Sequence, residues 1–463
     1  MKGNIRKWGL LSLTAVTAVS LLQGCSSGKP AQESATGNQP PQGKVDTIRI
    51  WHDDKTDVFK NNIQKFNDTI GKEKGIHIDL RVMGGSDYAD SLKVALAADQ
   101  GPELYKFVGT VKDQFVNAGW MQPLEDFPGS KEFLKGYEGE IIPEYNTYKG
   151  KVYSVPYIVI TTKMLYNKRL FEKAGITKVP ETWDEVVEAA RKITEKGEGK
   201  EFGFGTHLKD ATTMGGKWSY AVMFAPSVGH MGYNFKTGQY QFKDFQPMLE
   251  KILLMKKEKS IFPGAEGMEL DNLRAHFAEG RVGMMLGANW EVTNLKNSFP
   301  AKDDWGVAHV PVLDPSKKYK EYAQVGDYLV IGPAAKKNPE KTFIVYEYIH
   351  SLQFQRDILE AGNNFMAKKS VVEQSKIPDT KGWKEFSDLS TSYFTKTPPD
   401  GVLKLEGDSY QKTIAKIVAG GAPDIGKELE ALDKRYNDAL ARSLKDGFDI
   451  APFKDEKWDV SRK

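Results

Sequence analysis

Apolar residues after position 46 switch between strand spacing and helix spacing. The segment from Thr47 to Trp51 predicts a strand. Next, apolar residues three or four positions apart predict a helix, and Gly71 and Gly75 are expected to end it. A second strand is predicted where every other residue is apolar, between positions 76 and 82. The helical positions are Phe59, Ile63, Phe66 and Ile70.

The same alternation continues along the chain. A helix is predicted around Tyr88 to Ala98, and a strand within the sequence GPELYKFVG that follows. The resulting β-α-β-α-β order is typical of an open parallel sheet with helices on both faces. The chain is therefore predicted to belong to the α/β class.

Strands and helices also alternate in the second half of the chain. Thr182 and Glu185 match the capping-box pattern of a helix start. Gly280 is expected to end a helix that begins near Leu270. The residues after 370 have mostly helical patterns. Strands are predicted in the sequences EFGFG, RVGMML, WGVAHV and DYLVIG.

The sequence GMMLGANWEV, residues 283–292, places a large aromatic side chain where a strand is predicted to end. Three apolar residues are followed by Gly287, Ala288 and Asn289, and then by Trp290. Such a tryptophan either fills the core or offers its face to a ligand. The small and polar residues before it indicate a turn rather than a core strand, which favours the ligand hypothesis.

The N-terminus differs from the rest of the chain. Positive residues at 2, 6 and 7 precede an apolar segment from Gly9 to Leu22, which is too short for an ordinary spanning helix. Residues 1–24 are therefore predicted to be a signal peptide. The sequence LQGC resembles a bacterial lipobox, which implies that Cys25 becomes lipidated; a plain secretory signal with a chance cysteine is the alternative. Residues 25–45, rich in Ser, Gly, Pro and Gln, are predicted to form a flexible tether.

Composition and charge limit the function classes. The chain has 463 residues, of which 40% are hydrophobic and 27% are charged, enough for two or three domains with their own cores. The formal net charge is only +3 and basic residues are interspersed with acidic ones, so a nucleic-acid partner is not expected. Cys25 is the only cysteine, which excludes an intramolecular disulfide framework.

Motifs that carry catalytic chemistry are missing from the sequence. It has no phosphate-binding loop, no HExxH, no GxSxG and no CxxC. The seven histidines are scattered singly, so neither a metal site nor a cofactor is predicted. One acidic cluster, His52, Asp53 and Asp54, follows the first strand. Capping or ligand hydrogen bonding is favoured there over acid–base catalysis.

Several segments, taken in order, resemble the family-1 extracellular solute-binding proteins of bacterial ABC importers, the group that contains maltose-binding protein. The resemblance covers most of residues 46–350. Its most specific part is YKGKVYSVPYIVITTKMLYNKRLFEKAGITKVPETWDEVVEAARKI, and the other parts are IRIWHDD, ALAADQGPELYKF, NAGWMQPLEDF, FAEGRVGMMLGANW, WGVAHVPV and VGDYLVIGPAAKKNPE.

The resemblance implies a two-lobed periplasmic-binding-protein-like fold of type II, with discontinuous lobes joined by a hinge and a ligand cleft between them. Crossings between the lobes are expected near Val159 and Gln324, with a return near Ser370. The implied N-terminal lobe is 46–158 plus 324–370, and the implied C-terminal lobe is 159–323 plus 371–463.

Ligand-facing residues are also implied by the resemblance. In open α/β sheets ligands bind beyond the carboxyl ends of strands, and Trp51, Phe107, Trp290 and the stretch after Pro156 are predicted to lie at or past such ends. Aromatic faces can cover the apolar face of a sugar ring while polar side chains bond its hydroxyls. The predicted ligand-binding residues are Trp51, Asp53, Asp54, Phe107, Thr161, Trp218, Asn289, Trp290, Asp327 and Tyr328.

The implied function is a monomeric lipoprotein, attached through palmitate on the extracytoplasmic face of the cell membrane. It would bind a carbohydrate, expected to be an oligosaccharide, and would deliver it to the permease subunits of an ABC importer. One alternative is a binding protein for a peptide, polyamine or other non-sugar solute, since one fold can host several ligand classes. Another is a surface hydrolase or lyase that uses Asp53, Asp54 or Glu291.

Overall fold

The computed structural model describes part of the chain, and its residues 45–463 form one unit. The predicted signal peptide, the tether and Cys25 precede residue 45 and lie outside the described residues, as do Trp218 and Tyr328. None of the helices in the described ranges is long and apolar enough to cross a membrane. The structure describes residues 45–54, 56–83, 85–107, 112–143, 145–208, 220–327, 329–394 and 398–462.

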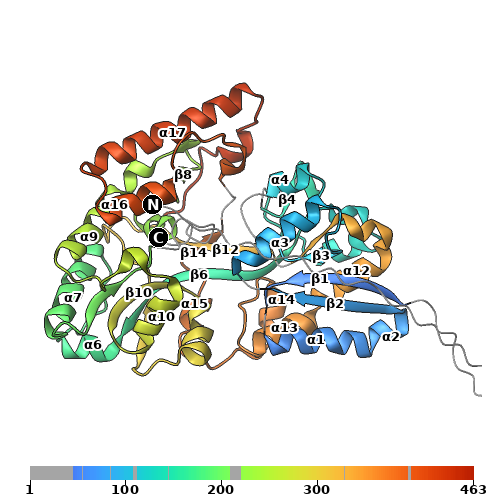
Figure 1. Ribbon diagram of the computed structural model, residues 1–463, viewed down its shortest axis with the longest axis horizontal. Helices are drawn as coiled ribbons and strands as arrows, with labels where there is room; N and C mark the ends of the chain where they lie inside the picture. Colours follow the sequence, from blue (N-terminus) through green and yellow to red (C-terminus); the bar gives the residue numbers. More distant parts are fainter. Residues whose placement is uncertain are drawn as a thin grey trace, which may run out of the picture. The chain divides into compact units, whose positions relative to one another are not determined.

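One sheet has the strand order β13-β3-β1-β2. Its centre is β1 (Asp46–His52), which runs parallel to β2 (Ile76–Val82) and to β3 (Leu104–Tyr105), as the alternating pattern predicts. Figure 1 shows β1 and β2 as neighbouring arrows with α1 (Asp57–Asp68) along the sheet. The fourth strand, β13 (Val330–Ile331), is antiparallel to β3.

The helix predicted between β1 and β2 is broken at Thr69 rather than at Gly71. There the backbone turns to φ −119° and ψ −97°, and a second helix, α2 (Ile70–Lys74), contains Gly71. A Cβ atom at Gly71 would lie 2.5 Å from the carbonyl oxygen of Ile76, so this glycine permits close packing instead of ending the helix. Gly75, at φ 62°, ends α2 as predicted.

A second sheet has the order β14-β12-β6-β10-β7, and β11 also pairs with β6. Its longest strand is β6 (Pro156–Asn167), which is antiparallel to both β10 and β12. The stretch after Pro156 was expected past a strand end, but it lies inside β6, because neighbours pair with it along its length. The other strands are β7 (Phe202–Gly205), β10 (Val282–Ala288), β11 (Trp305–Ala308), β12 (Glu321–Asp327) and β14 (Ser392–Phe394).

Three segments that are distant in sequence meet at the beginning of β6. Val159 pairs with Val325 of β12. On the same strand, Ile158 forms a bridge with Met366, and the Val159 N–H donates to the carbonyl of Phe365 at 2.7 Å. The crossings predicted near Val159 and Gln324 therefore fall on paired strands, and the segment 365–367, just before Ser370, runs beside them.

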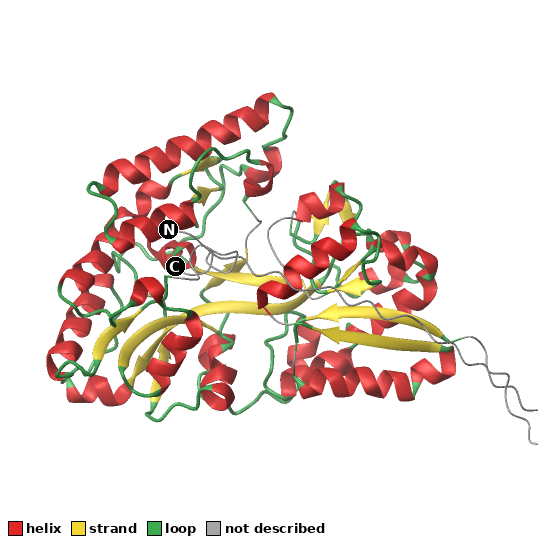
Figure 2. Ribbon diagram, viewed as in Figure 1, coloured by secondary structure: helices red, strands yellow, loops and turns green. Residues whose placement is uncertain are grey.

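Helices surround both sheets and dominate the residues after β14 (Figure 2), as the sequence predicts. The capping box at Thr182 and Glu185 is formed at the start of α7. Gly280 follows α10 in a left-handed conformation. The remaining α-helices of the described residues are α3 (Gly85–Ala97), α4 (Lys112–Asn117), α5 (Ser130–Lys135), α6 (Lys168–Lys173), α7 (Trp183–Lys196), α8 (Ala221–Val228), α9 (Gln246–Lys257), α10 (Leu270–Ala278), α11 (Glu291–Thr293), α12 (Pro339–Ile349), α13 (Leu352–Glu360), α14 (Lys369–Glu373), α15 (Trp383–Ser387), α16 (Tyr410–Ala419) and α17 (Ile425–Lys445). Two small hairpins pair β4 (Thr147–Tyr148) with β5 (Lys151–Val152), and β8 (Tyr233–Asn234) with β9 (Gln239–Tyr240).

Candidate ligand-binding site

Trp51 and Asp53 lie together at the carboxyl ends of β1 and β3. The backbone N–H of Lys106 donates to the carbonyl of Trp51 at 2.9 Å, which continues the parallel pairing. The same lysine reaches Asp53 with its ammonium group, 2.6 and 2.8 Å from the two carboxylate oxygens. This edge of a parallel sheet is where ligands bind in open α/β folds.

The Trp51 ring is half-buried, and one of its faces is covered by a cation. The guanidinium carbon of Arg81 lies 4.7 Å from the ring centroid. Such a contact favours one orientation of the ring, which also packs against the buried cluster that contains Tyr88 and Phe107. Asp53 is also partly exposed, with a side-chain accessibility of 31%. The pair therefore combines an oriented aromatic ring with a charged acceptor.

The side chains next to Trp51 and Asp53 make their contacts within the protein. Asp54 is buried and accepts hydrogen bonds from the N–H and the hydroxyl of Thr56, so it shapes the loop. The imidazole of His52 is buried; burial and the nearby Lys106 charge lower its pKa, which keeps the ring neutral. Phe107 is buried as well, with its ring centroid 5.3 Å from that of Phe115.

Asn289 and Thr161 lie where β10 ends against β6. The side-chain amide of Asn289 donates to the carbonyl of Val159 at 2.7 Å, and the backbone N–H of Asn289 donates to the carbonyl of Thr161 at 3.1 Å. The hydroxyl of Thr161 donates to the carbonyl of Phe386 at 2.8 Å. Both side chains are buried, so their polar groups tie β6 to its neighbours.

Trp290 is half-buried and lies between β10 and α11, where the sequence predicts a turn. The next residue, Glu291, is fully buried and is clasped by Arg274, with N–O distances of 2.8 and 2.7 Å. Burial raises the pKa of Glu291, while Arg274 and a hydrogen bond from Trp290 lower it. This ion pair fixes the position of the residue before it.

The predicted ligand residues thus fall into separate groups. Trp51, Asp53, Asp54 and Phe107 belong to the first sheet and the loops after its strands, whereas Thr161, Asn289 and Trp290 gather around β6. Asp327 ends β12, where its backbone pairs with Pro156, the first residue of β6. Among the described residues, no cluster of three or more His, Cys, Asp or Glu is arranged to hold a metal ion.

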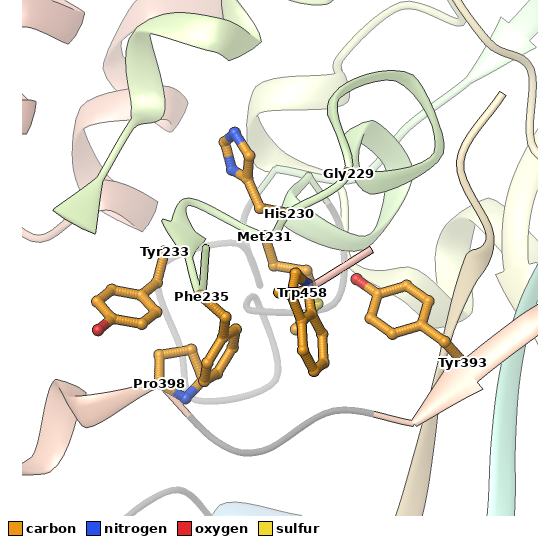
Figure 3. A pocket seen from close by; sticks show the side chains of 8 residues that line it. All are labelled: Gly229, His230, Met231, Tyr233, Phe235, Tyr393, Pro398 and Trp458. Atoms are coloured by element: carbon orange, nitrogen blue, oxygen red, sulfur yellow. The ribbon is translucent and has the colours of Figure 1, made fainter. Parts of the chain in front are cut away.

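An aromatic pocket near the C-terminus was not predicted. The space of about 230 Å³ around it includes open solvent, so the pocket itself is small (Figure 3). Trp458 was missed because it lies in the charged sequence DEKWDV, and an isolated aromatic residue in such a tail was the only local signal. The lining residues, called here the tail pocket, are Gly229, His230, Met231, Tyr233, Phe235, Tyr393, Pro398 and Trp458.

Comparison with known proteins places this geometry in context. Residues 52–353 match the family model described as bacterial extracellular solute-binding protein. A binding protein of Brucella abortus is 23% identical over 429 residues, which cover 86% of this chain and 97% of that one. The maltotriose-binding protein of Pyrococcus abyssi is 24% identical over 303 residues, covering 63% of this chain and 60% of that one.

A solved structure shows the same fold. It is an ABC transporter solute-binding protein from Thermotoga lettingae, bound with α-D-tagatose, and it aligns with a TM-score of 0.66. The alignment covers 86% of this chain and all of the other, at 24% identity. The prediction of a two-lobed α/β fold of the type II periplasmic-binding-protein class is confirmed.

Proposed function

Since the chain belongs to the family of bacterial extracellular solute-binding proteins, we propose that it captures an oligosaccharide and delivers it to the permease subunits of an ABC importer. The observation that carries the proposal is the family match over residues 52–353, together with a relative named for maltotriose. The ligand is held and released unchanged, because the family consists of binding proteins and the one fully buried carboxylate considered for catalysis, Glu291, is paired with Arg274.

The chemistry of the strand ends supports a sugar ligand. A sugar ring has an apolar C–H face and a rim of hydroxyls, so it requires an aromatic surface with acceptors and donors nearby. Trp51 offers a half-buried ring whose orientation is held by Arg81, with the Asp53 carboxylate two residues away. Trp290 offers a second half-buried ring. We assign these three side chains the direct contacts.

The other predicted contact residues have a different role in this proposal. Asp54, Phe107, Thr161 and Asn289 are buried, and their packing or hydrogen bonds hold the strand ends in place. Contacts from Trp218, Tyr328 and the side chain of Asp327 remain predictions from the sequence resemblance.

The proposed ligand cleft lies between lobes 46–158 plus 324–370 and 159–323 plus 371–463. Only a few strands would connect the two lobes, among them β6 and β12, which pair at Val159 and Val325. Such a connection can act as a hinge. Binding should then favour a closed state. Small-angle scattering with saturating ligand should give a smaller radius of gyration than without it, and identical curves would remove the hinge from the proposal.

The protein acts outside the cytoplasm, as its family does. We propose that the signal peptide 1–24 is removed, that Cys25 carries the lipid, and that residues 25–45 tether a monomeric binding unit to the membrane. A tether of this composition has a typical reach of about 25 Å, which clears the lipid head groups.

A thermal-shift screen tests the ligand class. Suitable probes are maltotriose, raffinose, stachyose and N,N′-diacetylchitobiose, with a polyamine and a tripeptide as non-sugar controls. A ligand at 100 times its Kd stabilises the native state by about 2.7 kcal/mol, which raises the melting temperature measurably. A shift with at least one sugar and none with the controls is expected; the reverse pattern would replace the sugar proposal by the non-sugar alternative.

A further inference from the structure

Trp290 is anchored through the residues on both sides of it in the chain. Before it, the side-chain amide of Asn289 donates to the carbonyl of Val159 on β6 at 2.7 Å. After it, the carboxylate of Glu291 accepts from the guanidinium of Arg274, which lies on α10 beside β10 (Figure 1). The backbone at Trp290 is therefore tied to two different elements, β6 and α10.

The ion pair between Arg274 and Glu291 is bidentate and buried. The Nε and Nη2 atoms of Arg274 lie 2.8 and 2.7 Å from the two carboxylate oxygens of Glu291. The two side chains are 11% and 0% exposed, and the Nη1 atom of the guanidinium donates to Asp271 at 2.6 Å. A planar guanidinium fork matches a carboxylate in one geometry, so Glu291 has a fixed orientation.

A glycine on β10 makes room for this carboxylate. A Cβ atom at Gly287 would lie 2.7 Å from the Cγ atom of Glu291 and 2.8 Å from the Cδ1 atom of Leu165. Any larger residue would therefore push the Glu291 stem away from its present position. The glycine that precedes Trp290 by three positions thus permits the ion pair that follows the tryptophan.

The same carboxylate also holds the Trp290 ring. Glu291 accepts a hydrogen bond from the Trp290 side chain, whose only donor is the indole N–H. The edge of the ring that carries this N–H therefore points to the buried ion pair. Trp290 is half-buried, and because its one donor is used within the protein, the part of the ring left to a ligand is apolar.

We propose that Arg274 is a positioning residue for ligand binding: through Glu291 it orients the Trp290 ring so that its apolar face meets a sugar ring. Arg274 itself does not contact the ligand. A contact side chain whose orientation is fixed before binding loses less conformational entropy when the ligand arrives. The inference rests on the proposed function, because it requires Trp290 to contact the ligand, and it adds to that function the residues that set the orientation of the ring.

The test variant, Arg274→Met/Glu291→Met, replaces both partners of the ion pair at once. Methionine has a flexible, unbranched side chain, and removal of both charges leaves neither of them buried without its partner. The control, Arg49→Met/Glu103→Met, removes another bidentate pair, at the first sheet, with N–O distances of 2.9 and 3.0 Å. Titration calorimetry of the mature chain with maltotriose, raffinose, stachyose and N,N′-diacetylchitobiose measures affinity, and thermal melting measures stability.

Arg274→Met/Glu291→Met is expected to bind the tightest of these sugars at least about tenfold more weakly than the wild type, which corresponds to 1.4 kcal/mol. The control should keep the wild-type affinity even where its melting temperature falls. A folded test variant that binds as tightly as the wild type would show that the ion pair is only structural, and would overturn the inference while the proposed function stands. If the wild type binds none of the sugars, the proposed function fails and the inference with it.

A double-mutant cycle shows whether the effect passes through Trp290. Trp290→Phe keeps an aromatic face but lacks the indole N–H that bonds to Glu291. In this background the two methionines should weaken binding by no more than about twofold, because the link that they break is already absent. The same loss in both backgrounds would mean that the ion pair acts on another part of the site, and would overturn the inference.

Arg274→Lys decides the question if the double methionine variant does not fold. Lysine keeps the positive charge beside Glu291 but lacks the planar fork that fixes the carboxylate. Affinity should fall several-fold, and the indole N–H signal of Trp290 should shift in a proton–nitrogen correlation spectrum, where its absence in Trp290→Phe identifies it. Wild-type affinity in Arg274→Lys would overturn the inference.

Discussion

The side-chain amide of Asn289 donates a 2.7 Å hydrogen bond to the backbone carbonyl of Val159, and so ties the end of β10 to the beginning of β6. The two residues are 130 positions apart in the sequence. Val159 also pairs with β12 and with the segment around Phe365. Asn289 therefore braces the strand at which three segments meet, and its effect on binding should be indirect.

Replacement of Asn289 by alanine should lower stability. The substitution leaves a carbonyl of β6 without its buried partner, and such a loss costs about 1–3 kcal/mol of the free energy of unfolding. Urea denaturation of Asn289→Ala measures the cost, with Asn297→Ala, at an exposed position, as control. An unchanged midpoint together with lost sugar binding would show that the amide contacts the ligand directly.

Trp290 and Trp183 should respond oppositely to truncation. Trp183 is fully buried beside Phe204 and Phe224, so Trp183→Ala should cost about 3–5 kcal/mol of unfolding free energy. Trp290 is half-buried, so Trp290→Ala should cost much less and should weaken sugar binding. Thermal melts and calorimetry on both variants decide this. A collapse of stability in Trp290→Ala would identify that ring as core.

Acid should destabilise the protein through His350. Burial lowers the pKa of His350 from 6.5 to about 4. Between these two pKa values the unfolded chain binds more protons than the native state. The stabilisation contributed by the neutral His350 ring is therefore fully present above pH 6.5 and is lost as the pH falls toward 4. At about 1.4 kcal/mol per pKa unit, the loss reaches about 3 kcal/mol.

The variant His350→Phe should lose less stability than the wild type between pH 7 and pH 4.5 in urea denaturation. The carbonyl of Tyr346, which accepts from the His350 ring, also accepts from the His350 backbone N–H, so the variant leaves it bonded. His77→Phe, at an exposed position of β2, is the control and should follow the wild type. Equal pH dependence in all three proteins would rule out His350 as the cause.

Lipid attachment is tested in cells by Cys25→Ser. Without the thiol no lipid can be added, so the protein should leave the membrane fraction for the soluble or precursor pool. Ser26→Ala keeps the thiol and should remain with the membrane. A membrane fraction that does not change in Cys25→Ser would contradict the lipobox interpretation.

Sequence patterns predicted the elements whose apolar periodicity is local. The β1 and β2 strands were evident because successive residues alternate between a more buried face and a more exposed face. Strand β12, in contrast, reads EYAQVGD and was missed. Its first residue, Glu321, is buried because it pairs with Lys163, which lies on β6, 158 positions away. No local pattern can show a charged residue that is buried by so distant a partner.

The candidate site shows the same limit. Trp51 and Trp290 were predicted as ligand contacts because each lies near the carboxyl end of a recognisable strand. The burial of Asn289 and Thr161 could not be predicted, since it depends on carbonyls of Val159 and Phe386 that only the fold brings near. Likewise, Trp458 becomes a pocket residue only when the tail pairs with residues around Lys320.

Titration calorimetry of the mature chain with maltotriose, raffinose, stachyose and N,N′-diacetylchitobiose, followed by chromatography of the recovered sugar, tests the central claim most directly. The account predicts saturable binding of at least one of these oligosaccharides with one site per chain, and recovery of that sugar intact. Absence of binding heat for all of them at millimolar concentration, or recovery of shortened products, would contradict the assignment as a sugar-binding protein.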